Sequence, residues 1–242
     1  MTDYKKQFIQ CLDSIDRSKN SYDVFQDFLT LTSLSLHNAI LRDKEIEEQH
    51  QKLWKQYNNS KQFAELLAIT TEALEQSFQD FLGEVFMLAG FGNTKNGQFF
   101  TPYHVSRVMA EINLDFNQIK QQIEEQGYFT LSDPCCGAGS MFIAAAETLL
   151  QKGLNPQKVM LFQGIDIDIK CCQMAYIQTS LLGLSGAILH GNTLTLEMWK
   201  RFITPMSYIN HNYIRNKERV LTPTTTAKII PFKKPEQIQK VK

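Results

Sequence analysis

The sequence predicts an α/β protein in which an N-terminal helical domain is followed by an incomplete parallel sheet. Over residues 1–89, apolar side chains recur with the period of an α-helix. Beyond residue 127, short β-favouring segments alternate with helical segments, an order that implies a doubly wound parallel sheet. Only about three parallel strands can be recognised, which leaves the predicted sheet short of the usual number.

The helical pattern recurs in five segments of residues 1–89. In the first segment, Phe8, Leu12 and Ile15 fall on one face because they are spaced by three or four residues. Comparable stripes lie at residues 25–36, 46–57, 63–74 and 78–86. The polar residues 58–60 form a break between two of these helices. We therefore expect residues 1–89 to form a helical domain.

A glycine-rich segment at residues 90–97 begins the second part of the chain. The sequence QFFTP follows at residues 98–102, and helices are expected near residues 104–112 and 118–126. Strand candidates then lie at residues 128–132, 159–165 and 187–190, and the helices between them lie at residues 141–151 and 168–182. Residues 90–196 are therefore expected to form one α/β domain.

The remaining residues, 197–242, are expected to form a basic and weakly structured tail that begins with a short helix at residues 197–203. Residues 200–242 contain ten Lys or Arg and only two Glu, which gives the segment a charge of about +8. Such a tail can contact the phosphates of nucleic acid, or it can be a solvated end without a ligand. Both interpretations remain open.

The composition is that of a globular protein, with 43% hydrophobic and 21% charged residues in a chain of 242. No apolar run approaches the ~20 residues needed to cross a bilayer, and no signal-peptide pattern follows the start. A cytoplasmic protein is therefore expected. The five cysteines include two adjacent pairs but no C-x-x-C spacing, which favours reduced thiols over a metal site.

The first predicted strand ends in a turn that is suited to a cationic ligand. Open α/β sheets bind their ligands at the carboxyl ends of the strands. This strand runs into DPCCGAGS at residues 133–140, where Asp133 can face a cationic group and the glycines allow a ligand to approach the backbone closely. A methyl-sulfonium donor with an α-amino group fits such a site.

The second and third strand ends supply an acid and an amide. Asp166 can accept hydrogen bonds from both ribose hydroxyls, whereas Asp168 is expected to cap the following helix. Asn192 can bind the exocyclic amine of adenine, although its alternative role is to stabilise a turn. We favour the ligand role because Asn192 follows the third predicted strand, and the first two strands already end in Asp133 and Asp166.

Two phosphate-binding loops are excluded at residues 133–140. A dinucleotide loop of the G-x-G-x-x-G type requires a third glycine, but Phe142 occupies that position. A P-loop requires Gly-Lys followed by Ser or Thr, and this sequence is absent. The methyl-donor interpretation therefore remains.

Four sequence blocks carry a specific resemblance to a known family. They are GQFFTP at residues 97–102, DPCCGAGSM at residues 133–141, GIDID at residues 164–168 and GNTL at residues 191–194. Together they resemble the adenine-specific DNA methylases, and in particular the modification subunit of type I restriction-modification systems. The resemblance covers about residues 60–196. It implies a Rossmann-like methyltransferase domain at residues 90–196, with S-adenosylmethionine as cofactor and double-stranded DNA as partner.

The resemblance also implies where the cofactor binds. Residues 98–102 would lie over its methionine end, with Thr101 at the cofactor carboxylate, whereas Phe100 is expected in the core. The expected cofactor-binding residues are Phe99, Thr101, Pro102, Asp133, Cys135, Gly137, Gly139, Ser140, Met141, Asp166, Ile167, Asn192, Thr193 and Leu194.

The catalytic motif of that family, Asn/Asp-Pro-Pro-Tyr/Phe, is missing. In this motif a side chain and a backbone carbonyl accept hydrogen bonds from the target amine, and the aromatic ring stacks on the flipped base. The sequence contains no Pro-Pro pair. The nearest imitation, residues 204–208, has one proline and neither an amide nor an acid. The catalytic residues are therefore unknown.

Three interpretations of the function remain open. The chain can be an adenine-specific methyltransferase that obtains its catalytic segment from another chain or uses an unusual one. It can instead be an inactive, cofactor-binding regulatory or assembly subunit, or a truncated methylase. We expect the isolated chain to be inactive. The candidate protein partners are a specificity subunit or a second methylase subunit, which the resemblance implies, or a second copy of this chain. The exposed edge of so small a sheet needs a cover, and the tail, the helical domain or a second copy can supply it.

Overall fold

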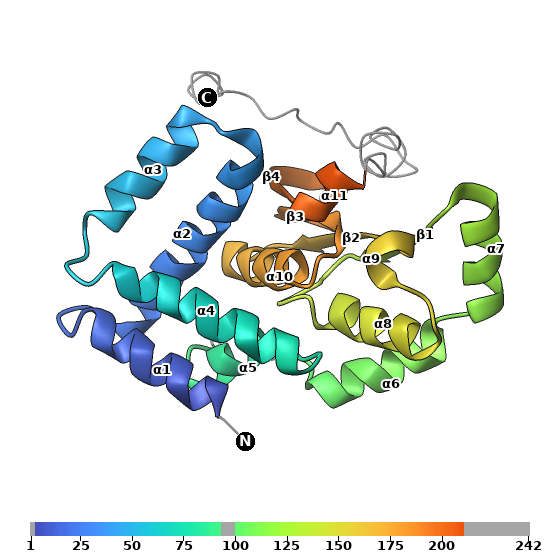
Figure 1. Cartoon of the computed structure of the whole chain (residues 1–242), viewed down its shortest axis with the longest axis horizontal. Coiled ribbons are helices and arrows are strands. Elements are labelled where there is room, and N and C mark those ends of the chain that lie inside the picture. The colour runs from blue at the N-terminus through green and yellow to red at the C-terminus, as the bar shows by residue number, and fades with distance from the viewer. Residues whose placement is uncertain (1–2, 93–99, 211–242) are drawn as a thin grey trace.

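The computed structural model describes residues 3–92 and 100–210 of the chain. Its N-terminal part consists of α1 (Tyr4–Ile15), α2 (Ser21–Leu41), α3 (Lys44–Trp54), α4 (Lys61–Gln76) and α5 (Phe81–Leu88). These five helices lie together at one end of the molecule, and the sheet with its flanking helices forms the remainder (Figure 1). The five helices predicted from the hydrophobic period are confirmed. None of the helices in the described part of the chain is long and apolar enough to span a membrane.

The ends of these helices follow from capping residues that the hydrophobic stripes do not reveal. Helix α2 starts earlier than its stripe because the Asn20 side chain accepts a hydrogen bond from the N–H of Tyr22. It ends at Leu41, and the C-cap Arg42 that follows adopts a left-handed conformation with φ of 53°. Asp3 and Asp43 accept comparable hydrogen bonds at the starts of α1 and α3.

The second part contains a four-stranded sheet in the order β1-β2-β3-β4. Its elements are α6 (Tyr103–Asn113), α7 (Phe116–Gln126), β1 (Phe129–Asp133), α8 (Ser140–Gln151), α9 (Pro156–Val159), β2 (Met160–Asp166), α10 (Ile169–Leu181), β3 (Ser185–Asn192), β4 (Glu197–Ile203) and α11 (Pro205–Ile209). Strands β1, β2 and β3 run parallel. The predicted α/β class, with a helical region before an incomplete and mostly parallel sheet, is confirmed.

The helix predicted at residues 197–203 is wrong, because this segment forms β4. It pairs antiparallel with β3, from Ala187 opposite Ile203 to Asn192 opposite Glu197. So short a segment has little helical stability of its own, whereas the strand buries Phe202 and Ile203 and completes the backbone hydrogen bonds of β3. Residues 197–203 therefore belong to the sheet. Residues 211–242 of the predicted tail lie outside the described residues.

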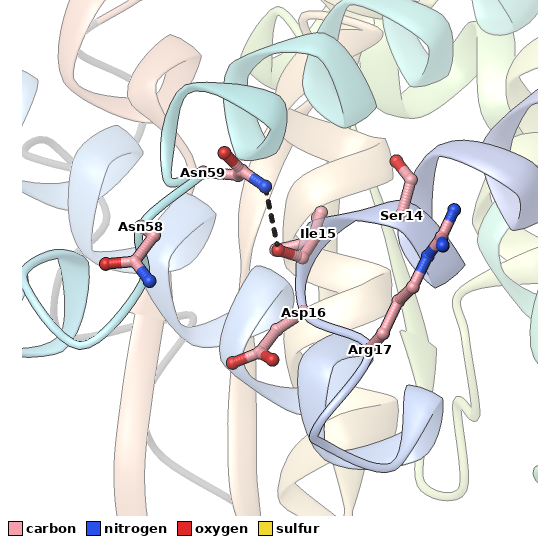
Figure 2. A pocket seen from close by; sticks show the side chains of 6 residues that line it. All are labelled: Ser14, Ile15, Asp16, Arg17, Asn58 and Asn59. Atoms are coloured by element: carbon pink, nitrogen blue, oxygen red, sulfur yellow. Dashed lines mark hydrogen bonds between the residues drawn. The ribbon is translucent and has the colours of Figure 1, made fainter.

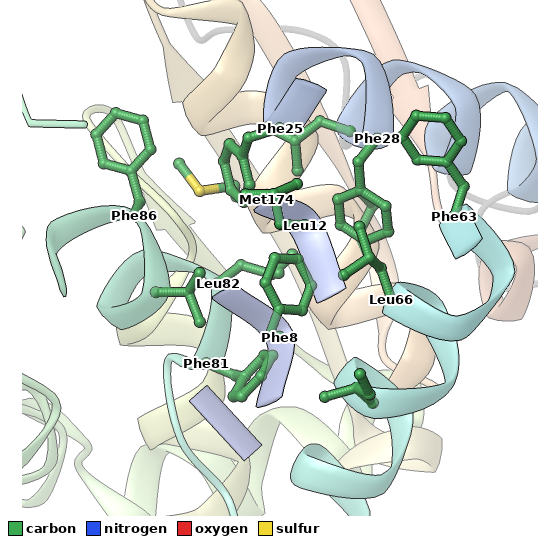
Figure 3. Packing of buried hydrophobic residues seen from close by; sticks show 14 of the residues in the cluster. Phe8, Leu12, Phe25, Phe28, Phe63, Leu66, Phe81, Leu82, Phe86 and Met174 are labelled. Atoms are coloured by element: carbon green, nitrogen blue, oxygen red, sulfur yellow. The ribbon is translucent and has the colours of Figure 1, made fainter. Parts of the chain in front are cut away.

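One hydrophobic cluster joins the N-terminal helices to α10. Phe8 of α1 packs edge-to-face on Phe25, Phe28 and Phe81, with ring centroids 6.2, 5.3 and 5.8 Å away. Met174 of α10 is fully buried in the same cluster (Figure 3). The N-terminal helices therefore pack directly on the helix that follows β2.

Asp80 is a buried carboxylate just before α5. It accepts hydrogen bonds from the N–H of Gly83 at 3.0 Å and from Nε2 of Gln178 at 2.9 Å. Burial raises the pKa of Asp80 to about 6, although these two hydrogen bonds act in the opposite direction. Among the neighbouring charges, Glu84 raises this pKa and Lys5 lowers it.

We expect Asp80→Asn to change how stability depends on pH. Because the pKa of Asp80 is raised from 3.8 to about 6 on folding, the folded chain binds this proton more tightly than the unfolded chain. The contribution of Asp80 to the free energy of unfolding should therefore fall by about 3 kcal/mol as pH rises through this window. Urea unfolding of both proteins at several pH values measures the difference, and a constant difference would contradict the expectation.

Candidate functional site

The carboxyl ends of β1, β2 and β3 lie next to one another at one edge of the sheet. In the parallel register, Asp133 of β1 is paired with Gly164, shortly before the end of β2 at Asp166. Asp166 is in turn paired with His190, shortly before the end of β3 at Asn192. The structure thus brings the three predicted strand-end residues to a common edge.

The turn after β1 depends on two glycines. Gly137 and Gly139 have φ of 53° and 90°, a region that residues with a side chain rarely adopt. Gly139 also lies against α10, where an added Cβ would stand 3.1 Å from the Cβ of Ala175. Both features explain why the turn needs glycine at these positions.

Hydrogen bonds fix this turn before α8 begins. The side chain of Asp133 accepts a hydrogen bond from the N–H of Cys135 at 2.9 Å. The N–H of Cys136 donates to the carbonyl of Ile165 in β2 at 2.9 Å. The acid at the end of β1 therefore shapes its own turn, and its remaining oxygen lone pairs can face a ligand.

Asp166 joins the first two loops. Its Oδ2 accepts a hydrogen bond from the N–H of Gly137, and its Oδ1 accepts one from the N–H of Asp168, both at 2.9 Å. Burial raises the pKa of Asp166, and the two backbone hydrogen bonds lower it. The side chain is only partly buried, and each oxygen keeps a second lone pair, so both can accept a hydrogen bond from a ligand.

The predicted capping role of Asp168 is confirmed. Its side chain accepts a hydrogen bond from the N–H of Lys170 at 2.9 Å, at the start of α10. It also forms an ion pair with Nζ of Lys170 at 2.9 Å. Asp168 thus caps α10, and Asp166 is the acid at the end of β2.

Asn192 stabilises the turn after β3. Its Oδ1 accepts hydrogen bonds from the N–H of Leu194 at 2.9 Å and of Thr195 at 3.3 Å. The structure therefore shows the turn role that the sequence left as the alternative. These two hydrogen bonds use both lone pairs of the amide oxygen. The ligand role of Asn192 stays a prediction.

The third loop is tied to the other two. The hydroxyl of Thr193 donates a hydrogen bond to the carbonyl of Pro134 in the first loop. Nε2 of His190 lies 3.1 Å from the carbonyl oxygen of Ile167 in the second loop. The loops after β1, β2 and β3 are thus all linked, which holds the candidate binding residues in a fixed relation.

The other predicted residues differ in their exposure. Ile167 and Leu194 are exposed large apolar side chains, with 62% and 94% of their surface accessible. Thr101 and Pro102 are exposed just before α6, and Met141 is half-buried in α8. Phe99 lies outside the described residues.

Ser140, a predicted cofactor-binding residue, and Phe100, which is expected in the core, both make contacts inside the protein. Ser140 is buried, and its hydroxyl is bonded to the hydroxyl of Ser106 in α6. Phe100 packs on Phe86 at 5.5 Å between ring centroids, and its ring would lie 3.3 Å from a Cβ added at Gly137. Phe100 therefore packs as expected and also covers the glycine turn.

The sequence did not indicate that His190 contacts the second loop or that Ser106 contacts Ser140. His190 contacts the second loop, and Trp199 of β4 packs on its ring with centroids 4.8 Å apart. A histidine at a strand end was visible in the sequence, but its partner Trp199 was assigned to a helix. Ser106 carries no local signal, because only the packing of α6 on α8 places it beside Ser140.

The cysteines near the site are thiols with different exposure. Cys135 is exposed in the first loop, whereas Cys136 and Cys172 are buried. Burial raises the pKa of the Cys136 and Cys172 thiols, which keeps them protonated and inert. Within residues 3–92 and 100–210, no group of three or more His, Cys, Asp or Glu side chains could hold a metal ion.

A separate surface pocket of about 370 Å³ lies between the end of α1 and the connection from α3 to α4 (Figure 2). It is lined by Ser14, Ile15, Asp16, Arg17, Asn58 and Asn59. Nδ2 of Asn59 donates a hydrogen bond to the carbonyl of Ile15 at 3.5 Å across it. None of these residues belongs to the strand-end loops, so the pocket is not part of the candidate site.

Two solved structures are similar to this chain at low sequence identity. A protein from Listeria monocytogenes, assigned to the class I S-adenosylmethionine-dependent methyltransferases, is 17% identical, with a TM-score of 0.41 over 80% of this chain and 55% of that one. A chain of the DrdV–DNA complex is 12% identical, with a TM-score of 0.35 over 88% of this chain and 24% of that one. This chain thus spans about half the length of the first protein and about a quarter of the second. No curated protein matches the sequence.

The family is shown by the sequence of the α/β part. The model of the N-6 DNA methylase family matches residues 77–225, more than half of the chain. The matched segment contains α5, the glycine turn and the ends of β1, β2 and β3. The protein therefore belongs to the N-6 DNA methylase family.

Proposed function

We propose that residues 90–196 bind S-adenosylmethionine at the carboxyl ends of β1, β2 and β3, and that the chain serves methylation of the adenine exocyclic amine in DNA. The observation that carries the proposal is the junction at Asp166, where one partly buried carboxylate orders two loops and keeps lone pairs for a ligand. The family match supports the same reaction.

The residues present fit this cofactor by their chemistry. The oxygens of Asp166 would accept the two ribose hydroxyls, and Asp133 would face the α-amino group. Thr101 would donate to the cofactor carboxylate. Exposed Ile167 and Leu194 would contact the faces of the adenine ring.

Asn192 takes a revised role in this proposal. Its oxygen already accepts two backbone hydrogen bonds, so it cannot also accept one from the adenine amine without losing the turn. We therefore assign its Nδ2 as a donor to a ring nitrogen of adenine. Cys135, Gly137, Gly139, Thr193 and the neighbouring Pro102, Ser140 and Met141 would shape the pocket around these contacts.

Methyl transfer needs groups that the sequence does not contain. The bound cofactor supplies an electrophilic methyl group on sulfur. The chain has no Pro-Pro motif to accept hydrogen bonds from the target amine, so we propose that a second methylase subunit or another partner supplies the catalytic segment. The missing motif equally favours a second candidate function, that of a cofactor-binding regulatory or assembly subunit without catalysis.

Calorimetry and a methyl-transfer assay separate these functions. We expect heat on titration of the chain with S-adenosylmethionine, and no transfer of labelled methyl to mixed double-stranded DNA by the chain alone. Transfer should appear when the products of the neighbouring genes are added. Absence of binding heat at high protein concentration would rule out the cofactor site, and binding without transfer in every combination would favour the regulatory subunit.

A further inference from the structure

Gln178 is a buried amide in the last turns of α10 that contacts two distant parts of the chain. Its side chain has 0% of its surface accessible. Its Oε1 accepts a hydrogen bond from the N–H of Leu82 in α5 at 2.9 Å. Its Nε2 donates to Oδ1 of Asp80 and to the carbonyl of Ala138, each at 2.9 Å. One side chain thus links the start of α5 to the glycine turn after β1.

The carbonyl of Ala138 is a sensitive point of that turn. Ala138 lies between Gly137 and Gly139, which both have positive φ. A hydrogen bond to this carbonyl therefore orients the peptide group that connects Ala138 to Gly139, which has φ of 90°. The next N–H, that of Gly139, donates to the carbonyl of Cys136 at 2.9 Å inside the same turn.

The contacts with the N-terminal helices determine which way the amide of Gln178 points. The N–H of Leu82 requires an acceptor, and the carboxylate of Asp80 requires a donor. A flipped amide would place a carbonyl oxygen against Asp80 and against the carbonyl of Ala138. The start of α5 thus selects the orientation in which Gln178 donates to the glycine turn at residues 136–139, which is the cofactor loop of the proposed function.

We propose that Gln178 is a positioning residue through which the N-terminal helices hold the cofactor loop in its binding conformation. The effect on the cofactor rests on the function proposed above. The effect on the loop does not, because it follows from the hydrogen bonds alone. The amide of Gln178 accepts one hydrogen bond and donates two, and no other side chain places one acceptor and two donors in the same positions.

Gln173 provides a matched control on the same helix. It is also a buried glutamine of α10, and its Nε2 donates to the hydroxyl of Thr30 in α2 at 3.3 Å. It therefore contacts the N-terminal helices, as Gln178 does, but has no hydrogen bond to the cofactor loop among the described residues. Gln178→Leu and Gln173→Leu both remove a buried amide of the same helix.

The first test compares cofactor affinity at a temperature where circular dichroism shows both variants folded. We expect Gln178→Leu to raise the Kd for S-adenosylmethionine about tenfold, and Gln173→Leu to change it less than about twofold. An equal change in both variants, or an unchanged Kd in Gln178→Leu, would overturn the positioning role. A wild-type chain that binds no cofactor would contradict the proposed function separately.

The second test reads the loop without any ligand. Amide hydrogen exchange should be faster at residues 136–139 in Gln178→Leu than in the wild type, and unchanged there in Gln173→Leu. Equal protection of residues 136–139 in all three proteins would overturn the inference even if the cofactor does not bind. Should Gln178→Leu not fold, Gln178→Asn keeps a polar group but shortens its reach, and the same exchange pattern is expected.

Discussion

Replacing Asp166 with Ala should weaken binding of S-adenosylmethionine at least about hundredfold. The substitution removes both proposed hydrogen bonds to the ribose, and each hydrogen bond to a charged group contributes about 1.5–3 kcal/mol. It also leaves the N–H groups of Gly137 and Asp168 without their acceptor, so the two loops lose their common anchor. Calorimetric titration of the folded variant measures the loss.

Asp115→Ala is the matched control for this experiment. Asp115 also accepts two backbone hydrogen bonds, from Asn117 and Gln118, but it does so at the start of α7 and belongs to none of the three strand-end loops. This variant should lose about 1 kcal/mol of stability and bind the cofactor as the wild type does. An Asp166→Ala protein that keeps wild-type affinity would remove Asp166 from the site.

Gly139→Val should lower the free energy of unfolding by about 2–5 kcal/mol. A left-handed conformation costs a residue with a side chain about 1–2 kcal/mol, and φ at Gly139 is 90°. The new side chain would also meet Ala175 of α10, because even a Cβ stands 3.1 Å from the Cβ of Ala175, and such overpacking costs about 1–3 kcal/mol. Urea unfolding followed by circular dichroism measures the change.

Gly153→Val separates the two causes. Gly153 has a comparable φ of 77°, but a Cβ at this position would meet nothing within 4 Å. This variant should therefore lose only the conformational part, about 1–2 kcal/mol. Equal losses in the two variants would show that the close packing of the cofactor loop on α10 is not a constraint.

The helices and the parallel strands could be predicted because their signals are local. The spacing of Phe8, Leu12 and Ile15 gives a helical face in any context, and these three residues are buried in α1 as expected. The strand ends at Asp133, Asp166 and Asn192 also follow from order alone, since parallel strands place their carboxyl ends at one edge.

Strand β4 could not be predicted because its stability depends on a partner. Residues 197–203 are too short a segment for the hydrophobic period to distinguish a helix from a strand. The choice is made by the free edge of β3, which pairs with the segment and buries Phe202 and Ile203. Tertiary pairing overrides local preference in such short segments.

Asn192 shows the same limit at the level of one residue. Its position after β3 predicted a polar group at the ligand edge, and the structure places it there. The turn decides which atom of Asn192 can bind a ligand, because the N–H groups of Leu194 and Thr195 already donate to its oxygen. Side-chain hydrogen bonds of this kind depend on loop geometry that the residue type alone does not specify.

By itself, the sequence determined the fold class, the order of the strand ends and the family, because periodicity and motif order are properties of the chain. The tertiary structure alone decided how the site is held together. Gln178 meets Ala138 and Asp80 across long stretches of sequence, and Thr193 meets Pro134 between loops. Such contacts arise only when separate elements pack, because a hydrogen bond requires atoms to be within about 3 Å and sequence distance carries no such information.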